Sequence, residues 1–314
     1  MMRQFRYLLF LSLWLICLTG PRDCFSQAPF TVVLGVAQDG GFPQVGCKKN
    51  CCSAAWQDPE LRRHVSSLGI VDPVSKERWL LDCTPDFKFQ HRMLEELIQF
   101  ESAPVLNGIF LTHAHMGHYT GLMHLGREVL GAEGVRVYAM PRMRSFLETN
   151  GPWDQSIRLN QIKLMKTAEG QEVRLNSRIK VVPFPVPHRD EYSETVGYRI
   201  TGPSRSVIFL PDIDKWDRWD VAIEDLVIDC DVAYLDGTFF DVNELPGRDM
   251  SEIPHPFVVE SIERFMGLSE KNRGKVRFIH LNHSNPLLDA NSKAFEGVRA
   301  AGHAVAQEGE RVTL

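Results

Sequence analysis

The sequence of 314 residues lacks several features that would place it in a specialised class of protein. It has no repeat, no low-complexity tract and no Gly/Ser-rich linker, which excludes disordered, collagen-like and coiled-coil architectures. It also lacks an excess of positive charge, because 35 Lys and Arg face 40 Asp and Glu. Since binding to nucleic acid depends largely on a basic surface, we expect a small-molecule ligand and no nucleic acid.

The sequence also lacks a convincing membrane span near its start. An apolar run from Tyr7 to Leu18 follows Arg3 and Arg6, and it is shorter than the roughly 20 residues that a spanning helix needs. Ser26-Gln27-Ala28 then offers the small-x-small pattern of a cleavage site. These features predict a signal peptide over residues 1–28 and a single mature domain over residues 29–314. They also predict a periplasmic or secreted location, with no stable membrane insertion after cleavage.

Cysteine is scarce, and five residues remain beyond the predicted signal peptide: Cys47, Cys51, Cys52, Cys83 and Cys230. An odd number of cysteines in an exported protein cannot form a closed set of disulfides. Either a thiol stays free or several thiols bind a metal. Cys83 and Cys230 follow apolar segments, and we expect both to be buried packing residues.

Strands dominate the expected secondary structure. The β-rich runs are Thr31–Val36, Trp79–Asp82, Gly108–Thr112, Val135–Met140, Lys180–Pro185, Val196–Thr201, Ser206–Leu210, Val232–Leu235 and Val276–Leu281. The expected helices are Phe87–Phe100, Tyr119–Leu130, Arg142–Thr149, Pro256–Gly267 and Ser292–Ala301. This pattern fits two packed sheets with helices outside them, and it also fits a doubly wound sheet.

Three histidines occur within six residues, at His113, His115 and His118. They follow the apolar segment Gly108–Leu111 and precede a helical run, so they lie on a strand-to-helix turn where side chains can converge. Neutral imidazole is the commonest protein ligand of zinc and also suits iron. The alternative is a solvated polar loop, which a single histidine would favour but three in one turn do not.

Further ligands are expected at the ends of other strands. His188 lies just past Val181–Val186, Asp212 just past Val207–Leu210, and His280 directly after Val276–Ile279. Strand ends followed by loops are where a rigid scaffold exposes functional groups. Together with the first cluster, these residues predict a metal site.

At this point the chain resembles the metallo-β-lactamase superfamily, whose signature is H-x-H-x-D-H followed by a distant His, a bridging Asp and a last His. More narrowly, the segments Gly40–Gln44, Ser193–Tyr198, Leu235–Phe239 and Asn282–Pro286 resemble the pyrroloquinoline quinone biosynthesis protein B branch. The resemblance covers roughly residues 30–290. It implies an α+β fold, a four-layer αββα sandwich with metals at the sheet edges.

The resemblance also implies a ligand set. His113, His115 and His188 would hold a first metal, and Asp212 would bridge to a second metal held by His118 and His280. One departure is that Gly117 occupies the position of the motif Asp, so the second site lacks a carboxylate and is weaker, takes a different metal or stays empty. Asp214 is a nearby substitute, although a cap of the following turn is the favoured role. Replacing Gly117 by Asp is expected to raise occupancy of the second site.

A second metal site is predicted from Cys47-Lys48-Lys49-Asn50-Cys51-Cys52, because thiolates at short spacing suit tetrahedral zinc. His283, three residues after His280, would complete this site. The chain is similar here to the cyclic phosphodiesterase of phosphonate catabolism, which pairs an N-terminal Cys cluster with a late His. The alternative is a disulfide, for which Cys47–Cys52 is favoured over the strained vicinal pair Cys51–Cys52.

These features favour an exported hydrolase with one or two catalytic Zn²⁺ and one structural Zn²⁺, with Mn²⁺ or Fe²⁺ as alternatives at the catalytic site. An acidified water would attack a phosphodiester, ester or lactone, with Asp212 and His255 as catalytic residues and His255 as the general acid. The alternative for His255 is a surface loop residue, and Asp236 is a candidate partner of a metal-bound histidine. The competing functions are an iron-dependent oxygenase of quinone cofactor biosynthesis and a non-catalytic small-molecule binding protein.

Overall fold

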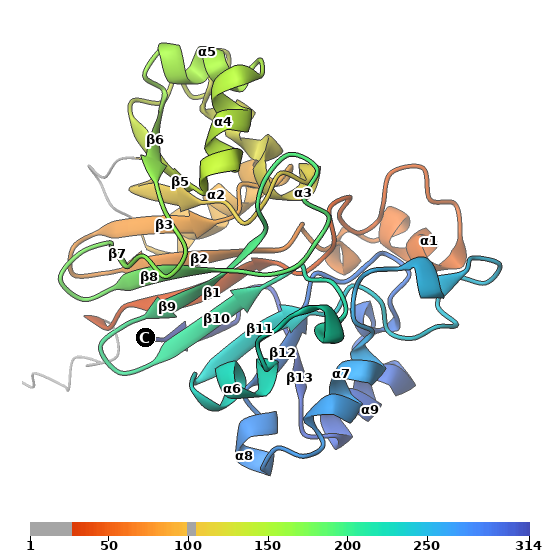
Figure 1. Cartoon of the computed structure of the whole chain (residues 1–314). Helices are drawn as coiled ribbons and strands as arrows, with labels where there is room; N and C mark the ends of the chain where they lie inside the picture. Colours follow the sequence, from red (N-terminus) through yellow and green to blue (C-terminus); the bar gives the residue numbers. More distant parts are fainter. Residues whose placement is uncertain (1–26, 99–104) are drawn as a thin grey trace, which may run out of the picture.

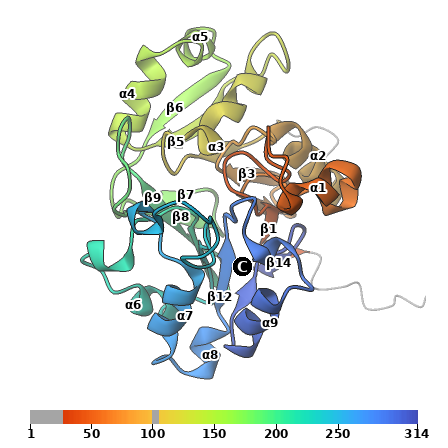
Figure 2. The same cartoon turned by 90° about the vertical axis from the view of Figure 1, so that its right-hand side faces the viewer.

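The protein is built around two mixed β-sheets that lie face to face (Figure 1). The computed structural model describes residues 27–98 and 105–314, so nearly all of the predicted signal peptide lies outside the described residues. Helices cover the outer faces of both sheets, and the view in Figure 2 shows the same layering from the side. The predicted four-layer αββα sandwich is therefore confirmed, and the doubly wound sheet is excluded.

The first sheet has the strand order β14-β1-β2-β3-β4-β5-β6. Its strands are β1 (Phe30–Gly35), β2 (Ser67–Asp72), β3 (Glu77–Leu81), β4 (Gly108–Phe110), β5 (Val135–Ala139), β6 (Ile162–Lys166) and β14 (Arg311–Thr313). Strands β3 to β6 pair in parallel, and the remaining pairs are antiparallel.

The second sheet has the order β13-β12-β11-β10-β9-β8-β7. Its strands are β7 (Val173–Arg174), β8 (Lys180–Pro185), β9 (Val196–Thr201), β10 (Ser206–Leu210), β11 (Val232–Asp236), β12 (Val276–Ile279) and β13 (Ala304–Val305). Strands β10 to β13 are parallel, and β7 to β10 are antiparallel. In both sheets the parallel half carries the crossover helices, as parallel strands require.

The helices divide between the two outer faces (Figure 1). Near the first sheet lie α1 (Asn50–Gln57), α2 (Phe87–Leu97), α3 (Met116–Tyr119), α4 (Pro141–Thr149) and α5 (Trp153–Arg158). Against the second sheet lie α6 (Ile223–Ile228), α7 (Val258–Phe265), α8 (Glu270–Arg273) and α9 (Lys293–Ala300). Short 3₁₀ helices occur at Pro59–Leu61, Thr120–Leu125, Trp216–Arg218, Met250–Glu252 and Pro286–Leu288. Within the described residues, no helix has both the length and the apolar character to cross a membrane.

Strand β10 shows how the layers are held together. Successive side chains of a strand point to opposite faces. Val207 and Phe209 pack into the core between the sheets, whereas Ile208 and Leu210 pack against the helices on the outer face. Because both faces are covered, the strand reads as a continuous apolar run rather than an alternating one.

A buried contact between the sheets fixes the end of β4. The ring of Tyr198 on β9 meets Phe110 edge-on at a centroid distance of 5.5 Å, and its hydroxyl donates a hydrogen bond of 2.6 Å to the carbonyl of Leu111. Both aromatic side chains are fully buried. This contact holds the segment that enters the histidine turn at His113 against the second sheet.

Every strand predicted from the sequence is present, with ends that shift by a residue or two. The structure adds β2, β6, β7, β13 and β14. Cys83 and Cys230 are buried free thiols, as predicted. The helix predicted over Phe87–Phe100 is α2, which ends at Leu97, and residues 99–104 lie outside the described residues.

The prediction of one continuous helix over Tyr119–Leu130 is wrong. The chain makes the short helix α3 and then a 3₁₀ helix over Thr120–Leu125. Gly121 lies directly against the backbone of Cys83 and Thr84, and a Cβ at this position would be 2.1 Å from the Thr84 carbonyl oxygen. This close approach sets the path of the segment, and helix periodicity alone does not reveal it.

Candidate metal centre

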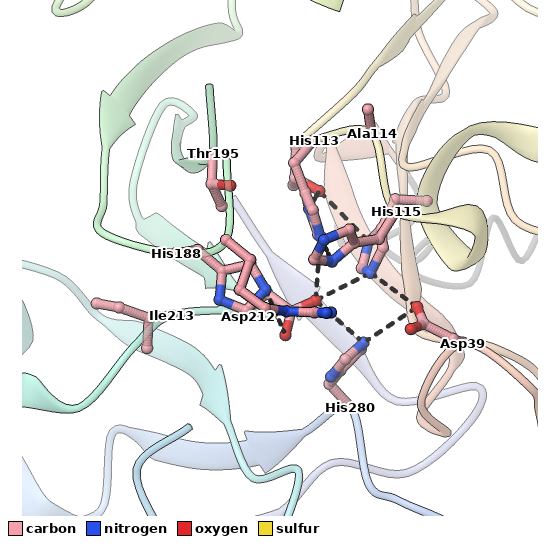
Figure 3. Close-up of polar contacts among 12 residues, drawn as sticks. Asp39, His113, Ala114, His115, His188, Thr195, Asp212, Ile213 and His280 are labelled. Carbon is pink, nitrogen blue, oxygen red and sulfur yellow. Dashed lines mark hydrogen bonds and ion pairs between the residues drawn. The ribbon is translucent and has the colours of Figure 1, made fainter. Parts of the chain in front are cut away.

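Imidazole and carboxylate side chains from separate segments meet where strands of the two sheets end (Figure 3). Strands β4, β8, β10 and β12 each end shortly before one of these residues. The structure brings together the six predicted ligands and one further residue: Asp39, His113, His115, His118, His188, Asp212 and His280. They form two adjoining clusters.

The first cluster contains His113, His115, His188 and Asp212, whose ligand atoms all lie within 4.8 Å of one another. His113 Nε2 is 2.8 Å from His115 Nδ1 and 3.4 Å from Asp212 Oδ2. His188 Nε2 is 3.8 Å from Asp212 Oδ1. Two ligand atoms that share a tetrahedral zinc ion at about 2.1 Å lie about 3.4 Å apart, so these separations suit one ion.

The second cluster contains Asp39, His118 and His280. Asp212 Oδ2 lies 3.1 Å from His118 Nε2 and 3.4 Å from His280 Nε2. The carboxylate of Asp212 therefore faces both clusters, which is the geometry that a bridging ligand requires.

Hydrogen bonds at the outer ring nitrogens orient the histidines. In four of them Nδ1 is held by a neighbouring side chain, which leaves Nε2 facing the centre. The pairs are His113 with Thr112, His118 with Asp82, His188 with Asp214, and His280 with Thr238, at 2.7–3.2 Å. His115 is turned the other way, because its Nε2 lies 3.2 Å from Glu191 Oε2 and its Nδ1 faces His113. Asp82 and His280 both adopt left-handed backbone conformations, with φ of 64° and 66°.

Several buried atoms in the centre have no hydrogen-bond partner within the described residues. A buried polar atom without a partner costs about 1–3 kcal/mol, and proteins tolerate few of them. The atoms are Asp39 Oδ1, His118 Nε2, His188 Nε2, Asp212 Oδ1 and His280 Nε2. These nitrogen and oxygen atoms carry lone pairs that can bind a metal, and they face the middle of the two clusters. The residues present therefore fit a divalent metal.

Electrostatics keep most of these groups in their ligand forms. Burial alone would raise the pKa of Asp212, but the imidazoles of His280 and His188 hold that pKa well below its ordinary value. Burial, with His118 beside it, lowers the pKa of His113 well below its ordinary value. Burial opposes protonation of His118, yet Asp82 and other carboxylates raise its pKa well above its ordinary value. Metal binding requires the neutral imidazole, so a cation at this position competes with protonation of His118.

Asp39 is the residue of the centre that sequence reasoning missed. Its Oδ1 lies 3.3 Å from His118 Nε2 and 3.9 Å from His280 Nε2. Burial would raise the pKa of Asp39, but His118 and His280 hold it well below its ordinary value. A signal was available, because Asp39 closely follows a strand and precedes Gly40-Gly41, the same strand-end pattern that identified Asp212.

The expectation that Gly117→Asp would restore a missing ligand is wrong. A Cβ at Gly117 would be 2.1 Å from Asp39 Oδ1 and 2.6 Å from Asp39 Cα. The space is already filled by another carboxylate.

Asp214 has neither of the two roles considered from the sequence. The residue at the cap position of the following 3₁₀ helix is Lys215, and no side chain caps that helix. Asp214 Oδ1 instead lies 3.2 Å from His188 Nδ1, and Asp214 Oδ2 accepts a hydrogen bond from Arg218. Its carboxylate orients His188 and does not reach the second cluster.

His255 lies beside the centre and is buried, which excludes the surface loop alternative. Its Nδ1 is 2.8 Å from Asp236 Oδ2 and 3.3 Å from Asp212 Oδ1. Burial would lower the pKa of His255, but Asp236 and Asp212 raise it to about 9. Asp236 also accepts hydrogen bonds from the backbone of Ile213 and from Thr238, so it is a fixed support for this imidazole.

The predicted cysteine site is also assembled. Cys51 and Cys52 lie in the first turn of α1, and Cys47 lies in the loop before it. Cys51 Sγ is 3.7 Å from both Cys47 Sγ and His283 Nδ1, and Cys52 Sγ is 3.4 Å from His283 Nδ1. Sulfur atoms about 2.3 Å from a tetrahedral zinc lie about 3.8 Å apart, so these separations suit zinc and exceed the S–S bond of about 2.05 Å in a disulfide.

Ionisation of one thiol in this site is opposed by the neighbouring sulfur atoms, as the pKa of Cys52 shows. Burial, together with Cys47 and Cys51, raises the pKa of the Cys52 thiol to about 12. A cation between the sulfurs would remove this barrier, because thiolate is the form that binds metal.

Comparisons with known proteins agree with this fold. A family model described as β-lactamase superfamily domain matches residues 77–280. Coenzyme PQQ synthesis protein B from Methylorubrum populi is 28% identical over 311 residues, which cover 90% of this chain and 99% of that protein.

Solved structures give the same result. Zn²⁺-bound PqqB from Methylobacterium extorquens has a TM-score of 0.75 and 23% identity, and the match covers 91% of this chain and 100% of that one. A diphosphatase from the PhnP family has a TM-score of 0.63 and 22% identity, with 90% and 96% covered. The chain is thus similar to PqqB over nearly its whole length, and it belongs to the metallo-β-lactamase superfamily.

Proposed function

We propose that the protein is an exported metal-dependent hydrolase that acts on a phosphodiester, ester or lactone of a small molecule. The observation that carries the proposal is the convergence of buried, partnerless nitrogen and oxygen atoms on two adjoining clusters that share Asp212. Such a shared carboxylate suits a pair of ions rather than a single one. Zn²⁺ fits the His-rich ligand set best, and the same donors also accept Mn²⁺ or Fe²⁺.

When bound, such ions supply an acidified water as nucleophile and polarise the group under attack. The chain itself contributes the orientation of the ligands. Asp82 and Asp214 each hold one imidazole through Nδ1, so the Nε2 atoms keep their direction when the centre is occupied. This support is built from buried or half-buried side chains at strand ends, which limits their movement during a reaction.

In this proposal His255 delivers a proton to the leaving group. Its Nδ1 is anchored by Asp236 at 2.8 Å, and its Nε2 makes no hydrogen bond within the described part of the chain. Only 8% of the side chain is exposed, so the free nitrogen lies at the edge of the centre rather than in bulk solvent. A general acid needs this combination of a fixed ring and an accessible second nitrogen.

The fold neighbour that is named as a diphosphatase supports hydrolysis at phosphorus for this scaffold. The second candidate function is an oxidative step in quinone cofactor biosynthesis that uses bound iron. It is favoured by the relative named coenzyme PQQ synthesis protein B, which aligns over 90% of this chain. A centre of several histidines with a carboxylate also binds iron, so the two candidates differ first in metal and co-substrate.

The test is to purify the protein without added metal, measure zinc, manganese and iron per chain, and assay hydrolysis. The substrates are bis(p-nitrophenyl) phosphate, p-nitrophenyl acetate and a γ-lactone. His188→Ala removes a ligand of the first cluster, and His303→Ala is the control because His303 is a buried imidazole that contacts the carbonyl of Arg273 far from the centre.

Turnover that His188→Ala abolishes and His303→Ala preserves is the expected result. Bound iron with oxygen consumption in the presence of a quinone precursor would favour the second candidate. A fully metal-loaded protein that binds these small molecules without turnover would instead indicate a binding protein. For export, we expect a mature N-terminus near Pro29 in the extracytoplasmic fraction, and a full-length cytoplasmic protein would contradict it.

A further inference from the structure

Gly117 and Asp39 are in direct contact, and a side chain at residue 117 would overlap with Asp39. Gly117 lies in α3, between Met116 and His118, at the position where the superfamily motif carries Asp. A Cβ on Gly117 would lie 2.1 Å from Asp39 Oδ1 and 2.9 Å from Asp39 Cγ, well inside van der Waals contact. The two positions therefore cannot both carry a carboxylate in this backbone, and the missing side chain at residue 117 makes room for the one at residue 39.

The loop that carries Asp39 is fixed on both sides. The backbone of Gln38 donates a hydrogen bond of 2.8 Å to Leu281, the neighbour of His280, and Ala37 forms a β-bridge with Leu281. After Asp39, Gly41 donates to Gln38 at 2.7 Å and closes a tight turn. Gly41 has a φ of 68°, which a residue with a side chain rarely adopts. The carboxylate of Asp39 is thus directed at the centre by backbone contacts of its own loop.

Asp39 has no other role that explains its position. Its Oδ1 is buried and makes no hydrogen bond within residues 27–98 and 105–314, although it lies within 4 Å of His118 Nε2 and His280 Nε2. The cap position of α3 is His115, and no side chain caps that helix. A buried carboxylate oxygen that faces two imidazole nitrogens, each also without a partner, is arranged as a ligand.

We infer that Asp39 is a carboxylate ligand of the second metal and replaces, from the loop after β1, the aspartate that the motif helix lacks at Gly117. The second site then consists of Asp39, His118, His280 and the shared Asp212, so it keeps two carboxylates and is not a weakened remnant. This inference rests on the proposed metal centre. It adds a ligand that the motif does not contain, and it predicts a pairing between residues 39 and 117.

The experiment measures zinc per chain after gel filtration in metal-limited buffer, zinc affinity by competition with a chelator, and the zinc-induced shift in melting temperature. The variants are Asp39→Asn, Asp39→Ala, Gly117→Asp and the double variant Asp39→Gly/Gly117→Asp. Asp58→Asn is the control, because Asp58 is an exposed carboxylate in the same N-terminal region that accepts a hydrogen bond from the backbone of Glu60.

We expect Asp39→Asn and Asp39→Ala to lose one zinc per chain or to bind it far more weakly. Loss of an outer-shell partner already costs about 10 to 100-fold in metal affinity, so loss of a ligand should cost at least that much. Gly117→Asp alone should lower the melting temperature because of the clash with Asp39. The double variant removes the clash with the Asp39 side chain but leaves the added Cβ 2.6 Å from the Cα of residue 39. It should therefore regain the second zinc, since its carboxylate returns to the motif position, but only part of the melting temperature.

Two failures are distinguishable. If wild-type protein binds only the metal of the cysteine site, the proposed metal centre itself is wrong. If wild-type protein binds its full complement and Asp39→Asn retains the same stoichiometry, affinity and zinc-induced shift, Asp39 is not a ligand. The isosteric Asp39→Asn variant decides the matter even where the double variant does not fold.

Discussion

Loss of the cysteine site should cost the protein stability without removing the catalytic centre. The site joins the start of α1 to His283, and Cys52 and His283 are 231 positions apart in the sequence. In the chain-entropy model a link that closes a loop of this length destabilises the unfolded chain by about 5 kcal/mol. We expect Cys52→Ala to lower the free energy of unfolding by about 3–5 kcal/mol, which corresponds to a fall in melting temperature of about 6–20 °C.

The assay combines calorimetry with zinc and thiol counts. Wild-type protein without residues 1–28, unfolded in chelator, should expose five thiols, whereas a Cys47–Cys52 disulfide would leave three. Cys52→Ala should lose one zinc per chain and keep its hydrolytic activity below the new melting temperature. Cys230→Ala is the matched control, because Cys230 is buried in the hydrophobic core outside the second sheet, and its thiol lies 3.6 Å from the carbonyl of Val227. It should keep every zinc and lose only the packing of one sulfur atom.

A Cys52→Ala variant with unchanged zinc content and unchanged melting temperature would refute the structural zinc. Three thiols in the wild-type protein, with a melting temperature that falls in reductant but not in chelator, would establish the disulfide in its place.

Three further predictions follow from the site and its supports. His255→Gln should lower kcat by about 10² to 10⁴-fold with metal content unchanged, and retention of full activity would exclude His255 as the general acid. Tyr198→Phe should cost about 1–3 kcal/mol in chemical denaturation because it leaves the buried Leu111 carbonyl without its donor, and a cost near zero would mean that water replaces the hydroxyl. Burial alone would lower the pKa of His64, but Glu308 raises this pKa above its ordinary value near 6.5. The ion pair therefore stabilises the folded protein fully below about pH 6.5, and this stabilisation is lost as the pH rises through the raised pKa of His64. The melting temperature advantage of wild-type protein over Glu308→Gln should therefore shrink from about pH 6 to pH 8, and an advantage that grows with pH would contradict the assignment.

Local patterns in the sequence were sufficient for much of this molecule. The histidines from His113 to His118 are close in sequence, so one strand-to-helix turn gathers them and their spacing is informative. His188, Asp212 and His280 could be predicted because each follows an apolar strand, and the ends of neighbouring strands meet at a sheet edge. The same reasoning holds for the long buried strands, whose apolar runs depend on burial of both faces.

Contacts between distant segments could not be predicted in the same way. Gly117 reads as a lost ligand in the sequence, because nothing local to α3 reveals that Asp39 occupies the adjacent space. Strands β7 and β13 are only two residues long, too short to show a period, and they form because a neighbouring strand offers hydrogen bonds. The role of Asp214 depended on where His188 points, which a turn preference does not specify.

The left-handed backbone of His280 has a practical consequence for engineering. An L residue in that conformation is strained by about 1–2 kcal/mol, whereas glycine adopts it freely and asparagine tolerates it. In a screen for heat resistance on metal-free protein, His280→Asn should rank above other replacements of this buried residue, because relief of the strain offsets part of the loss of its contacts with Thr238 and Asp212. Selection by melting temperature alone would thus tolerate the loss of this ligand, as expected where stability and activity conflict. In excess zinc the same variant should fall much further below the wild-type protein, since the bound ion then stabilises only the proteins that retain the histidine.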